Sequence, residues 1–286
     1  MESKAIDPAD FREAQHKQWD SAAVGWKECS EFSESAWGHI SERLVELAEV
    51  RSGSRVLDVA AGYGEPALTA AREAGRDGRV VATDISAEML AFGRERAAAA
   101  GLGNVEFMQS DACSLDFPQA SFDAAVSRWG IIFEPDAEAA AARIRGFLKP
   151  GARIAISSWG KPDQVPFLSI PMRTMMERLD VPPPPAGTPG IFSRPTPVSL
   201  GGLLEGGGFS KVAVEQAEVT FDFDSPEHFT AYIRAVSAPV RAIIEQYAGE
   251  AQEEAWDAIT QAAAGAGGGS KPLSFSNVVL LASATA

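Results

Sequence analysis

The sequence predicts an α/β fold built on a doubly wound, mostly parallel sheet. Between Arg55 and Trp159, short runs rich in Val, Ile and Ala alternate with runs of helical composition. Strands that alternate with helices favour a parallel sheet, because right-handed crossovers return each strand to its neighbour's side. With 45% hydrophobic and 22% charged residues in a chain of 286, there is enough apolar material for one large folded domain.

The N-terminal region is expected to be helical. Residues 8–50 carry apolar side chains such as Ile40, Leu44 and Leu47 at helical spacing, and the segment RSGSR at 51–55 then interrupts the pattern. The alternating region that follows predicts, in order, a strand at 55–60, a helix at 65–75, a strand at 79–85, a helix at 86–101, strands at 105–111 and 122–129, a helix at 137–148 and a strand at 152–159.

Local signals place the ends of two of these helices. Ser86 is a good N-cap, Gly101 suits the position just after a helix, and Pro66 suits a first helical turn. The helix at 86–101 is therefore the best defined from sequence.

The last third of the chain departs from the alternation. The proline-rich stretch DVPPPPAGTPG predicts irregular backbone after a helix. The elements expected there are a helix at 167–179, a helix near 197–209, a long strand at 211–223, helices at 225–237 and 239–263, a Gly-rich turn, and a final strand at 274–284. The two late strands can pair antiparallel with each other.

Charge and composition exclude several classes of protein. A formal net charge of −14 repels phosphate backbones, so neither nucleic acid nor an anionic membrane is an expected partner. Cys29 and Cys113 are too few for a disulfide framework, and the three histidines lack metal-ligand spacing, so we expect no metal. No apolar run approaches the ~20 residues of a membrane span. An acidic N-terminus without an apolar signal core predicts a cytoplasmic protein. We expect a monomer or a homodimer.

Acidic residues stand at three predicted strand ends. Asp58, Asp84 and Asp111 follow successive strands, which brings them to one edge of the sheet, where ligands of open α/β folds bind. Gly62 and Gly64 allow a tight turn and close approach of the backbone to a ligand. The edge is therefore expected to hold a cofactor.

Two cofactors fit this edge, and charge separates them. Gly62 to Ala67 satisfies the loose G-x-G-x-x-G/A pattern of dinucleotide sites. However, Asp58 and Glu65 would repel a pyrophosphate. S-adenosylmethionine (SAM) carries an ammonium and a sulfonium, which an acidic turn tolerates and which would compensate a buried Asp58.

Several motifs resemble those of class I SAM-dependent methyltransferases. VLDVAAGYGEPAL resembles their motif I, VVATDISAEML motif II, FMQSDACSLDFPQASFDAAVSRWGIIFEPD motifs III and IV, and LKPGARIAISSW the post-motif. The resemblance runs in order through residues 50–160 and is greatest to the small-molecule branch, including ubiquinone/menaquinone-type and natural-product methyltransferases. Ala60 departs from the usual glycine, and the C-terminal half matches no substrate-defining motif.

The resemblance implies a Rossmann-like sheet of seven strands with an antiparallel last strand and a helical cap. We expect a single methyltransferase domain over 1–286: an N-terminal helical cap (1–50), a SAM-binding core (51–160), an inserted cap segment (161–197), and the C-terminal part of the sheet with a helical insertion (198–286). The implied activity is methyl transfer from SAM, leaving S-adenosylhomocysteine, to the O, C or N atom of a small apolar or aromatic acceptor. The alternatives are a SAM-binding protein without methyl transfer and a dinucleotide-dependent oxidoreductase.

Roles for individual residues follow from the same resemblance. Asp84 is expected to hold the ribose hydroxyls, Ile85 and Met89 to border the adenine, and Asp111 and the Ala112 N–H to meet its edge. The methionine moiety is assigned to Asp58, Ala60, Ala61, Gly62, Gly64 and Ser127, with Trp26 closing the pocket.

The acceptor side is less defined by sequence. Trp129 stands at the rim where an acceptor would approach, and Met172, Met175 and Met176 offer adaptable apolar surface. No catalytic residue is assigned; His16 and His39 are candidate bases, and Arg128 could orient or polarise an acceptor.

Overall fold

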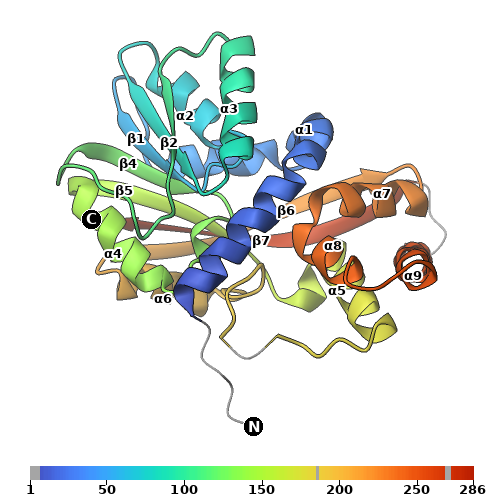
Figure 1. Ribbon diagram of the computed structural model, residues 1–286. Coiled ribbons are helices and arrows are strands. Elements are labelled where there is room, and N and C mark those ends of the chain that lie inside the picture. The colour runs from blue at the N-terminus through green and yellow to red at the C-terminus, as the bar shows by residue number, and fades with distance from the viewer. Residues whose placement is uncertain (1–6, 185–186, 268–271) are drawn as a thin grey trace.

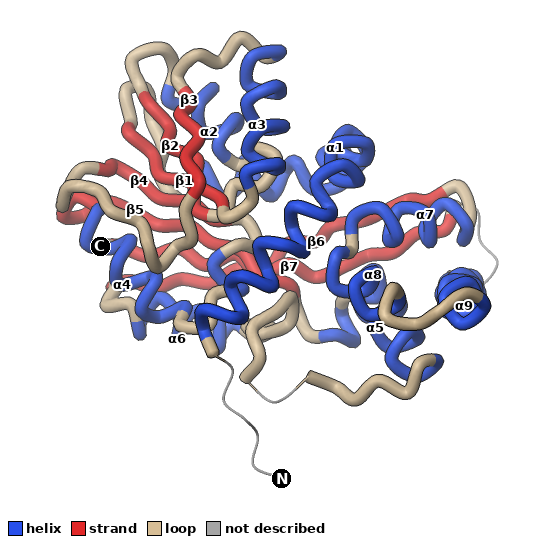
Figure 2. The backbone as a smooth tube through the Cα atoms, viewed as in Figure 1, coloured by secondary structure: helices blue, strands red, loops and turns tan. Residues whose placement is uncertain are grey.

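A computed structural model describes residues 7–184, 187–267 and 272–286. Among these residues seven strands form one sheet, in the order β3-β2-β1-β4-β5-β7-β6, which Figure 2 shows as a continuous layer. The strands are β1 (Arg55–Val59), β2 (Arg79–Asp84), β3 (Val105–Gln109), β4 (Phe122–Ser127), β5 (Leu148–Trp159), β6 (Ser210–Phe223) and β7 (Leu273–Thr285).

Pairing between the strands confirms the predicted fold class. β1 pairs in parallel with β2 and β4, and β4 pairs in parallel with β5. β7 runs antiparallel to both β5 and β6. The sheet is therefore Rossmann-like, mostly parallel, with an antiparallel last strand.

Helices cover both faces of the sheet (Figure 1). They are α1 (Pro8–Leu47), α2 (Ala67–Ala74), α3 (Ala87–Ala99), α4 (Ala137–Phe147), α5 (Pro166–Arg178), α6 (Pro197–Gly206), α7 (Pro226–Val236), α8 (Ala238–Ile244) and α9 (Glu250–Ala266), with short 3₁₀ turns η1 (Ile131–Phe133) and η2 (Pro162–Gln164). None of the described helices combines the length and apolarity needed to cross a membrane.

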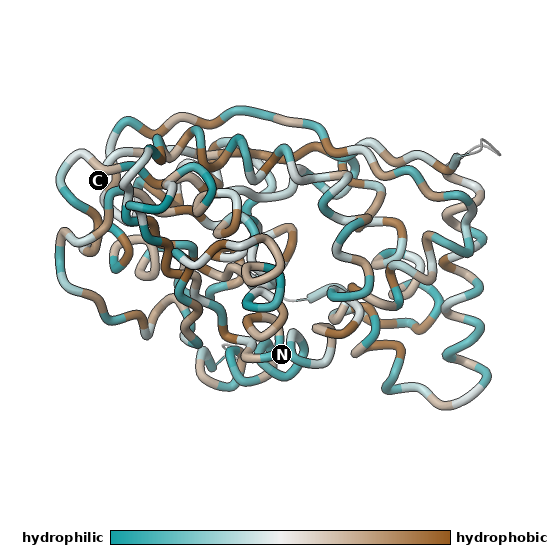
Figure 3. The backbone as a smooth tube through the Cα atoms, turned by 90° about the horizontal axis from the view of Figure 1, so that it is seen from above, coloured by the Kyte–Doolittle hydropathy of each residue, from teal (hydrophilic) through white to brown (hydrophobic). Residues whose placement is uncertain are grey.

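Alternate residues of the central strands serve two cores. Val56 and Ala124 belong to a core that also holds residues of α1, α2, α5 and α7 to α9, whereas their neighbours Leu57 and Ala125 belong to one that holds residues of α4 and α6. Side chains of a strand alternate between faces, so strands covered on both faces are apolar throughout. Along the outer helices, hydrophilic and hydrophobic segments alternate instead (Figure 3).

Two features of the helices differ from the sequence prediction, and a predicted turn lies partly outside the described residues. Ser86 is the N-cap of α3 and Gly101 follows it at φ 68°, as expected, but Pro66 is the N-cap of α2 and not part of its first turn. The helix expected over 239–263 is two helices, α8 and α9. Residues 245–249 separate them, and Gly249 at the end of this break has a φ of 52°. The Gly-rich turn falls partly on 268–271, outside the described residues.

α1 packs closely on α7 because one of its residues has no side chain. A Cβ at Gly25 would collide with the carbonyl oxygen of Ala235 on α7. The backbone of α7 occupies the space that any larger residue at this position would need.

The variant Gly25→Ala is expected to lower the free energy of unfolding by about 1–3 kcal/mol, since α1 and α7 must separate. Gly38→Ala on the same helix is the control: its Cβ would meet Glu34 Oε2 at an ordinary 3.7 Å, and alanine favours helix over glycine. Urea denaturation of both variants tests this, and equal stability of the two would contradict it.

Candidate active site

A pocket opens at the carboxyl edge of β1, β2 and β4, the position that open α/β sheets use for ligands. Of the residues singled out from sequence, it brings together Ala60, Ala61, Gly62, Asp84, Ile85, Met89, Asp111, Ala112, Trp26, Arg128, Trp129 and Met172. Its lining leaves out Asp58, Gly64, Ser127, Met175, Met176, His16 and His39.

The turn after β1 forms one wall of the pocket. Ala60, Gly62 and Gly64 have φ values of 58°, 52° and 108°, a region that glycine enters freely and alanine at some cost. The turn is bonded to the end of β2, since the Ala61 N–H donates to the Thr83 carbonyl at 2.9 Å. Alanine at position 60 therefore keeps the conformation of a glycine turn.

Asp84 ends β2 with its carboxylate held by two backbone amides. Oδ2 accepts from the Gly62 N–H and Oδ1 from the Ser86 N–H, both at 2.8 Å. Burial raises the pKa of Asp84 to about 6, and these two hydrogen bonds oppose the shift. Asp84 is thus oriented in the pocket, and each oxygen keeps accepting capacity for a further donor.

Asp58 lies behind the turn, which corrects its expected place beside the cofactor. Its side chain has no exposed surface, and neither carboxylate oxygen has a hydrogen-bond partner. Burial raises its pKa well above the usual range, opposed by the nearby Ala67 N–H and the charge of Arg128. Asp58 was expected to be compensated by the cationic groups of SAM, but its side chain does not line the pocket.

The variant Asp58→Asn, whose buried amide lacks partners as the carboxylate does but cannot ionise, is expected to gain stability relative to wild type as the pH rises toward neutrality. The folded protein binds this proton more tightly than the unfolded chain, so wild-type stability falls as the pH rises above about 3.9. The advantage of the variant should therefore grow between pH 4 and pH 7 in denaturation curves. A gain that is the same at both pH values would contradict this account.

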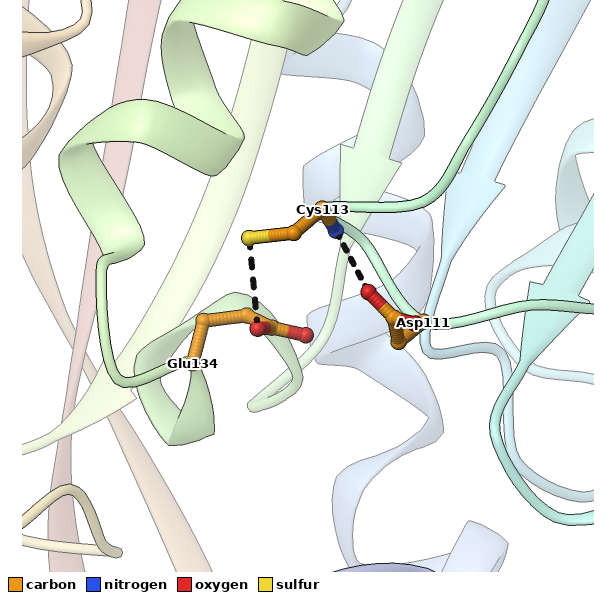
Figure 4. Close-up of side chains that lie close together, drawn as sticks. All are labelled: Asp111, Cys113 and Glu134. Atoms are coloured by element: carbon orange, nitrogen blue, oxygen red, sulfur yellow. Dashed lines mark hydrogen bonds between the residues drawn. The ribbon is translucent and has the colours of Figure 1, made fainter. Parts of the chain in front are cut away.

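Asp111, Cys113 and Glu134 gather at the rim (Figure 4). Asp111 Oδ1 accepts from the Cys113 N–H at 2.9 Å, and the Cys113 thiol donates to Glu134 Oε2 at 3.5 Å. Glu134 Oε1 accepts from the Ala112 N–H at 3.2 Å, the group expected to meet a ring nitrogen. Glu134 was not singled out from the sequence, although it lies within the segment that resembles motifs III and IV.

These three side chains are close enough to surround a metal ion, but an arginine already offsets part of their negative charge. Arg12 Nε lies 3.5 Å from Glu134 Oε2 and 3.9 Å from Asp111 Oδ1. Burial raises the pKa of Cys113 to about 11, and metals bind the thiolate rather than the thiol. The cluster is therefore a pair of carboxylates whose charge is partly offset by one arginine.

Helix α1 closes the pocket with aromatic rings. Trp26 stacks on Tyr63 of the turn at 5.6 Å between centroids and on Trp37 at 5.9 Å. Trp19 meets Phe133 edge-on at 5.6 Å. The indole Nε1 of Trp26 is buried without a hydrogen-bond partner.

Aromatic and aliphatic side chains line the other half of the pocket. Trp129 and Trp159 stack in parallel, with centroids 4.6 Å apart and an interplanar angle of 4°, and Phe167 and Met172 of α5 join them in the lining. The other two methionines of α5, Met175 and Met176, are absent from the lining. Met175 is 1% exposed in the core and Met176 packs against that core, so the prediction that these two line the pocket is wrong.

Arg128 belongs to a buried ion pair that sequence analysis did not foresee. Nη2 lies 2.6 Å from Glu34 Oε1, Nη1 lies 3.1 Å from Glu34 Oε2, and Nη1 also donates to Ser41 Oγ at 2.8 Å. Tyr63 donates its hydroxyl proton to Glu34 Oε1 at 2.6 Å. The side chain thus ties β4 to α1.

The two histidine candidates and Ser127 lie outside the pocket lining. His39 is exposed and its Nε2 lies 3.0 Å from the Glu218 carbonyl. His16 Nε2 lies 3.0 Å from Asp20 Oδ2. Ser127 Oγ donates to the Val59 carbonyl at 2.7 Å, which supports the turn from behind.

Fold and site together define an α/β enzyme for a nucleoside-containing cofactor, because an oriented acidic residue ends β2 beside a left-handed turn after β1. A model of the "Methyltransferase domain" family matches residues 56–151.

Curated relatives extend this match. The chain is 34% identical over 177 residues to the ubiquinone/menaquinone biosynthesis C-methyltransferase UbiE of Teredinibacter turnerae, covering 58% of this chain and 71% of that protein. It is 42% identical over 119 residues to UbiE of Pseudomonas putida, covering 41% of this chain and 46% of that protein. The chain belongs to the class I SAM-dependent methyltransferases of the small-molecule branch; its cofactor is SAM, and its activity is methyl transfer to a small molecule.

Solved structures share the fold. The YcgJ protein of Bacillus subtilis has a TM-score of 0.56 at 18% identity, covering 87% of this chain and 98% of that one. The [4+2]-cyclase SpnF has a TM-score of 0.54 at 18% identity, covering 92% and 95%.

Proposed function

We propose that the acceptor is a small apolar or aromatic molecule, held in the aromatic half of the pocket while SAM lies along the ends of β1 and β2. The observation that carries this proposal is the division of one pocket into two halves. The lining near Asp84 combines carboxylates with apolar side chains such as Ile85 and Met89, whereas the lining near Trp129, Phe167 and Met172 is apolar.

We also propose which residues hold SAM, because the pocket offers suitable groups for each part of the cofactor. Asp84 would accept from the ribose hydroxyls, while Ile85 and Met89 would flank the adenine. Trp26, which stacks on Tyr63 of the turn, would cover the methionine moiety with its ring. Asp58, Gly64 and Ser127 would not contact SAM; they would support the conformation of the turn after β1.

The adenine edge is assigned to Asp111, whose position is fixed by the amides of Cys113 and Ser114. The Ala112 N–H would reach a ring nitrogen only after Glu134 rotates away from it. When bound, SAM supplies an electrophilic methyl group on its sulfonium.

The contribution of the protein to the transfer is alignment and exclusion of water. His16 and His39 lie outside the lining, and Arg128 is committed to Glu34. We therefore propose positioning by the aromatic walls, without a histidine base, and with attack by an O, C or N atom of the acceptor.

The proposal extends to the domain organisation, partners, compartment and oligomeric state of the protein. A single domain over 1–286 is supported by the shared pocket, which takes residues from the N-terminal helix, the core and the inserted segment. A net charge of −14 supports partners other than nucleic acid, and two free cysteines suit the reducing cytoplasm. We propose a monomer or homodimer.

Calorimetric titration with SAM, S-adenosylhomocysteine and NADH tests the cofactor assignment. We expect saturable binding of both sulfur ligands and none of NADH. Methyl transfer is then sought across phenols, quinols and amines. Binding of NADH alone would favour a dinucleotide oxidoreductase, and SAM binding without transfer to any acceptor would favour a SAM-binding protein of other function.

A further inference from the structure

The backbone N–H of Ala112, the group proposed to bond a ring nitrogen of adenine, already has a partner in the protein. It donates to Glu134 Oε1 at 3.2 Å, and both residues belong to the pocket lining. An amide N–H carries one hydrogen, so the base and the Glu134 carboxylate cannot both be bonded well by it. Entry of the adenine ring therefore requires the carboxylate to leave.

The carboxylate can leave without a change in the backbone. The Glu134 N–H donates to the Ile131 carbonyl at 3.1 Å, which anchors the main chain just after η1. The second carboxylate oxygen, Oε2, accepts from Arg12 Nε and from the Cys113 thiol, both at 3.5 Å. The first bond is longer than is usual for N–H donors, and a thiol is a weak donor. Rotation about the side-chain bonds of Glu134 is thus enough to free the Ala112 N–H.

Arg12 of α1 offers the displaced carboxylate a new position. Its Nε lies 3.5 Å from Glu134 Oε2, whereas charge-assisted N–H···O bonds are about 2.7–2.9 Å long, so this ion pair can still tighten. The same nitrogen lies 3.9 Å from Asp111 Oδ1, the carboxylate assigned to the adenine amino group. Arg12 therefore limits the repulsion between the two acids when Glu134 moves.

We propose that Glu134 competes with the adenine base: its carboxylate occupies the Ala112 N–H in the free protein and moves toward Arg12 when the cofactor binds. This inference rests on the proposed function and adds to it a residue that lowers the affinity for the cofactor. Binding exchanges one hydrogen bond of the Ala112 N–H for another, so the bond to the ring nitrogen contributes little net affinity while Glu134 is present.

The test measures the affinities of wild type and variants for S-adenosylhomocysteine and for adenosine by calorimetry. Both ligands carry adenine, and adenosine lacks the amino-acid tail. Glu134→Ala is expected to bind each of them roughly threefold to tenfold more tightly than wild type does, the worth of one hydrogen bond. The factor should be the same for both ligands, because the competition takes place at the base. Tightening of S-adenosylhomocysteine alone would overturn the inference.

Two variants separate the hydrogen bond from space and from charge. Glu134→Gln keeps the size of the side chain but offers an uncharged, weaker acceptor, so its affinity for both ligands should lie between those of wild type and Glu134→Ala. Glu106→Ala removes an exposed carboxylate of β3 outside the pocket lining and should bind as wild type does. A Glu134→Gln protein that binds as wild type does, or a Glu106→Ala protein that gains as much as Glu134→Ala, would overturn the inference.

The variant Arg12→Met tests where the carboxylate goes. In the wild-type background it is expected to weaken binding of S-adenosylhomocysteine, because the displaced Glu134 then lies beside Asp111 without a cation. In the Glu134→Ala background the loss is expected to be smaller. An equal loss in both backgrounds would show that the movement toward Arg12 is wrong.

The same measurements separate this inference from the proposed function. If wild-type protein binds S-adenosylhomocysteine and Glu134→Ala binds it no more tightly, the role of Glu134 is wrong and the cofactor assignment stands. Failure of wild-type protein to bind S-adenosylhomocysteine would instead overturn the proposed function.

Discussion

The variant Arg128→Met is expected to lose about 3–5 kcal/mol of folding free energy, because it leaves the Glu34 carboxylate buried without its cation. Arg128 is 8% exposed and holds Glu34 through both terminal nitrogens. Burial tends to raise the pKa of Glu34, but the charge and hydrogen bonds of Arg128 outweigh it and lower that pKa. Guanidinium denaturation followed by circular dichroism measures the loss.

Two further variants separate the buried pair from charge in general. The double variant Glu34→Leu/Arg128→Met is expected to recover much of the loss, since it removes both charges. Lys27→Met breaks the exposed pair with Glu95, whose side chains are 51% and 61% exposed, and is expected to cost less than about 1 kcal/mol. If Arg128→Met costs as little stability as Lys27→Met, the buried Arg128–Glu34 pair contributes no more to stability than an exposed ion pair.

The same pair predicts acid sensitivity. Because the folded-state pKa of Glu34 is lowered, its stabilisation is complete well above about pH 4.3 and is lost as the pH falls through the folded-state value. The stability difference between wild type and the double variant should therefore shrink in acid.

Asp84→Ala is expected to weaken binding of SAM and S-adenosylhomocysteine by about tenfold to a hundredfold, the range for hydrogen bonds to a charged group. The variant also leaves the Gly62 N–H without its acceptor, which loosens the turn. Asp84→Asn keeps one acceptor oxygen, so its affinity for both ligands should lie between those of wild type and Asp84→Ala. Calorimetry compares the three proteins at pH 8, where the Asp84 carboxylate of wild type, with a pKa of about 6, is ionised.

The exposed carboxylate of Asp116 supplies the control, since it lies outside the pocket lining; Asp116→Ala should bind both ligands as wild type does. Wild-type affinity is expected to fall as the pH is lowered through about 6, where Asp84 takes up a proton. Unchanged affinity in Asp84→Ala would show that Asp84 does not hold the ribose.

Much of the scaffold could be predicted because its signals are local. The strand at β2, the Ser86 cap and the left-handed glycines after β1 depend on residues within a few positions of one another. Asp84 is the last residue of β2, so predicting that strand also predicts the position of Asp84 at the edge of the sheet. The break between α8 and α9 was missed because a helical pattern continues across it.

The sequence by itself determined the alternating fold, the turn and the acidic edge, because periodicity and backbone preference act over short distances. Only the tertiary structure decided the pairing of Glu34 with Arg128, the position of Asp58 behind the turn, and which methionine of α5 faces the pocket. Each of these depends on how α1 and α5 pack on the sheet. Such packing is set by shape and burial between segments far apart in the chain, which no local pattern encodes.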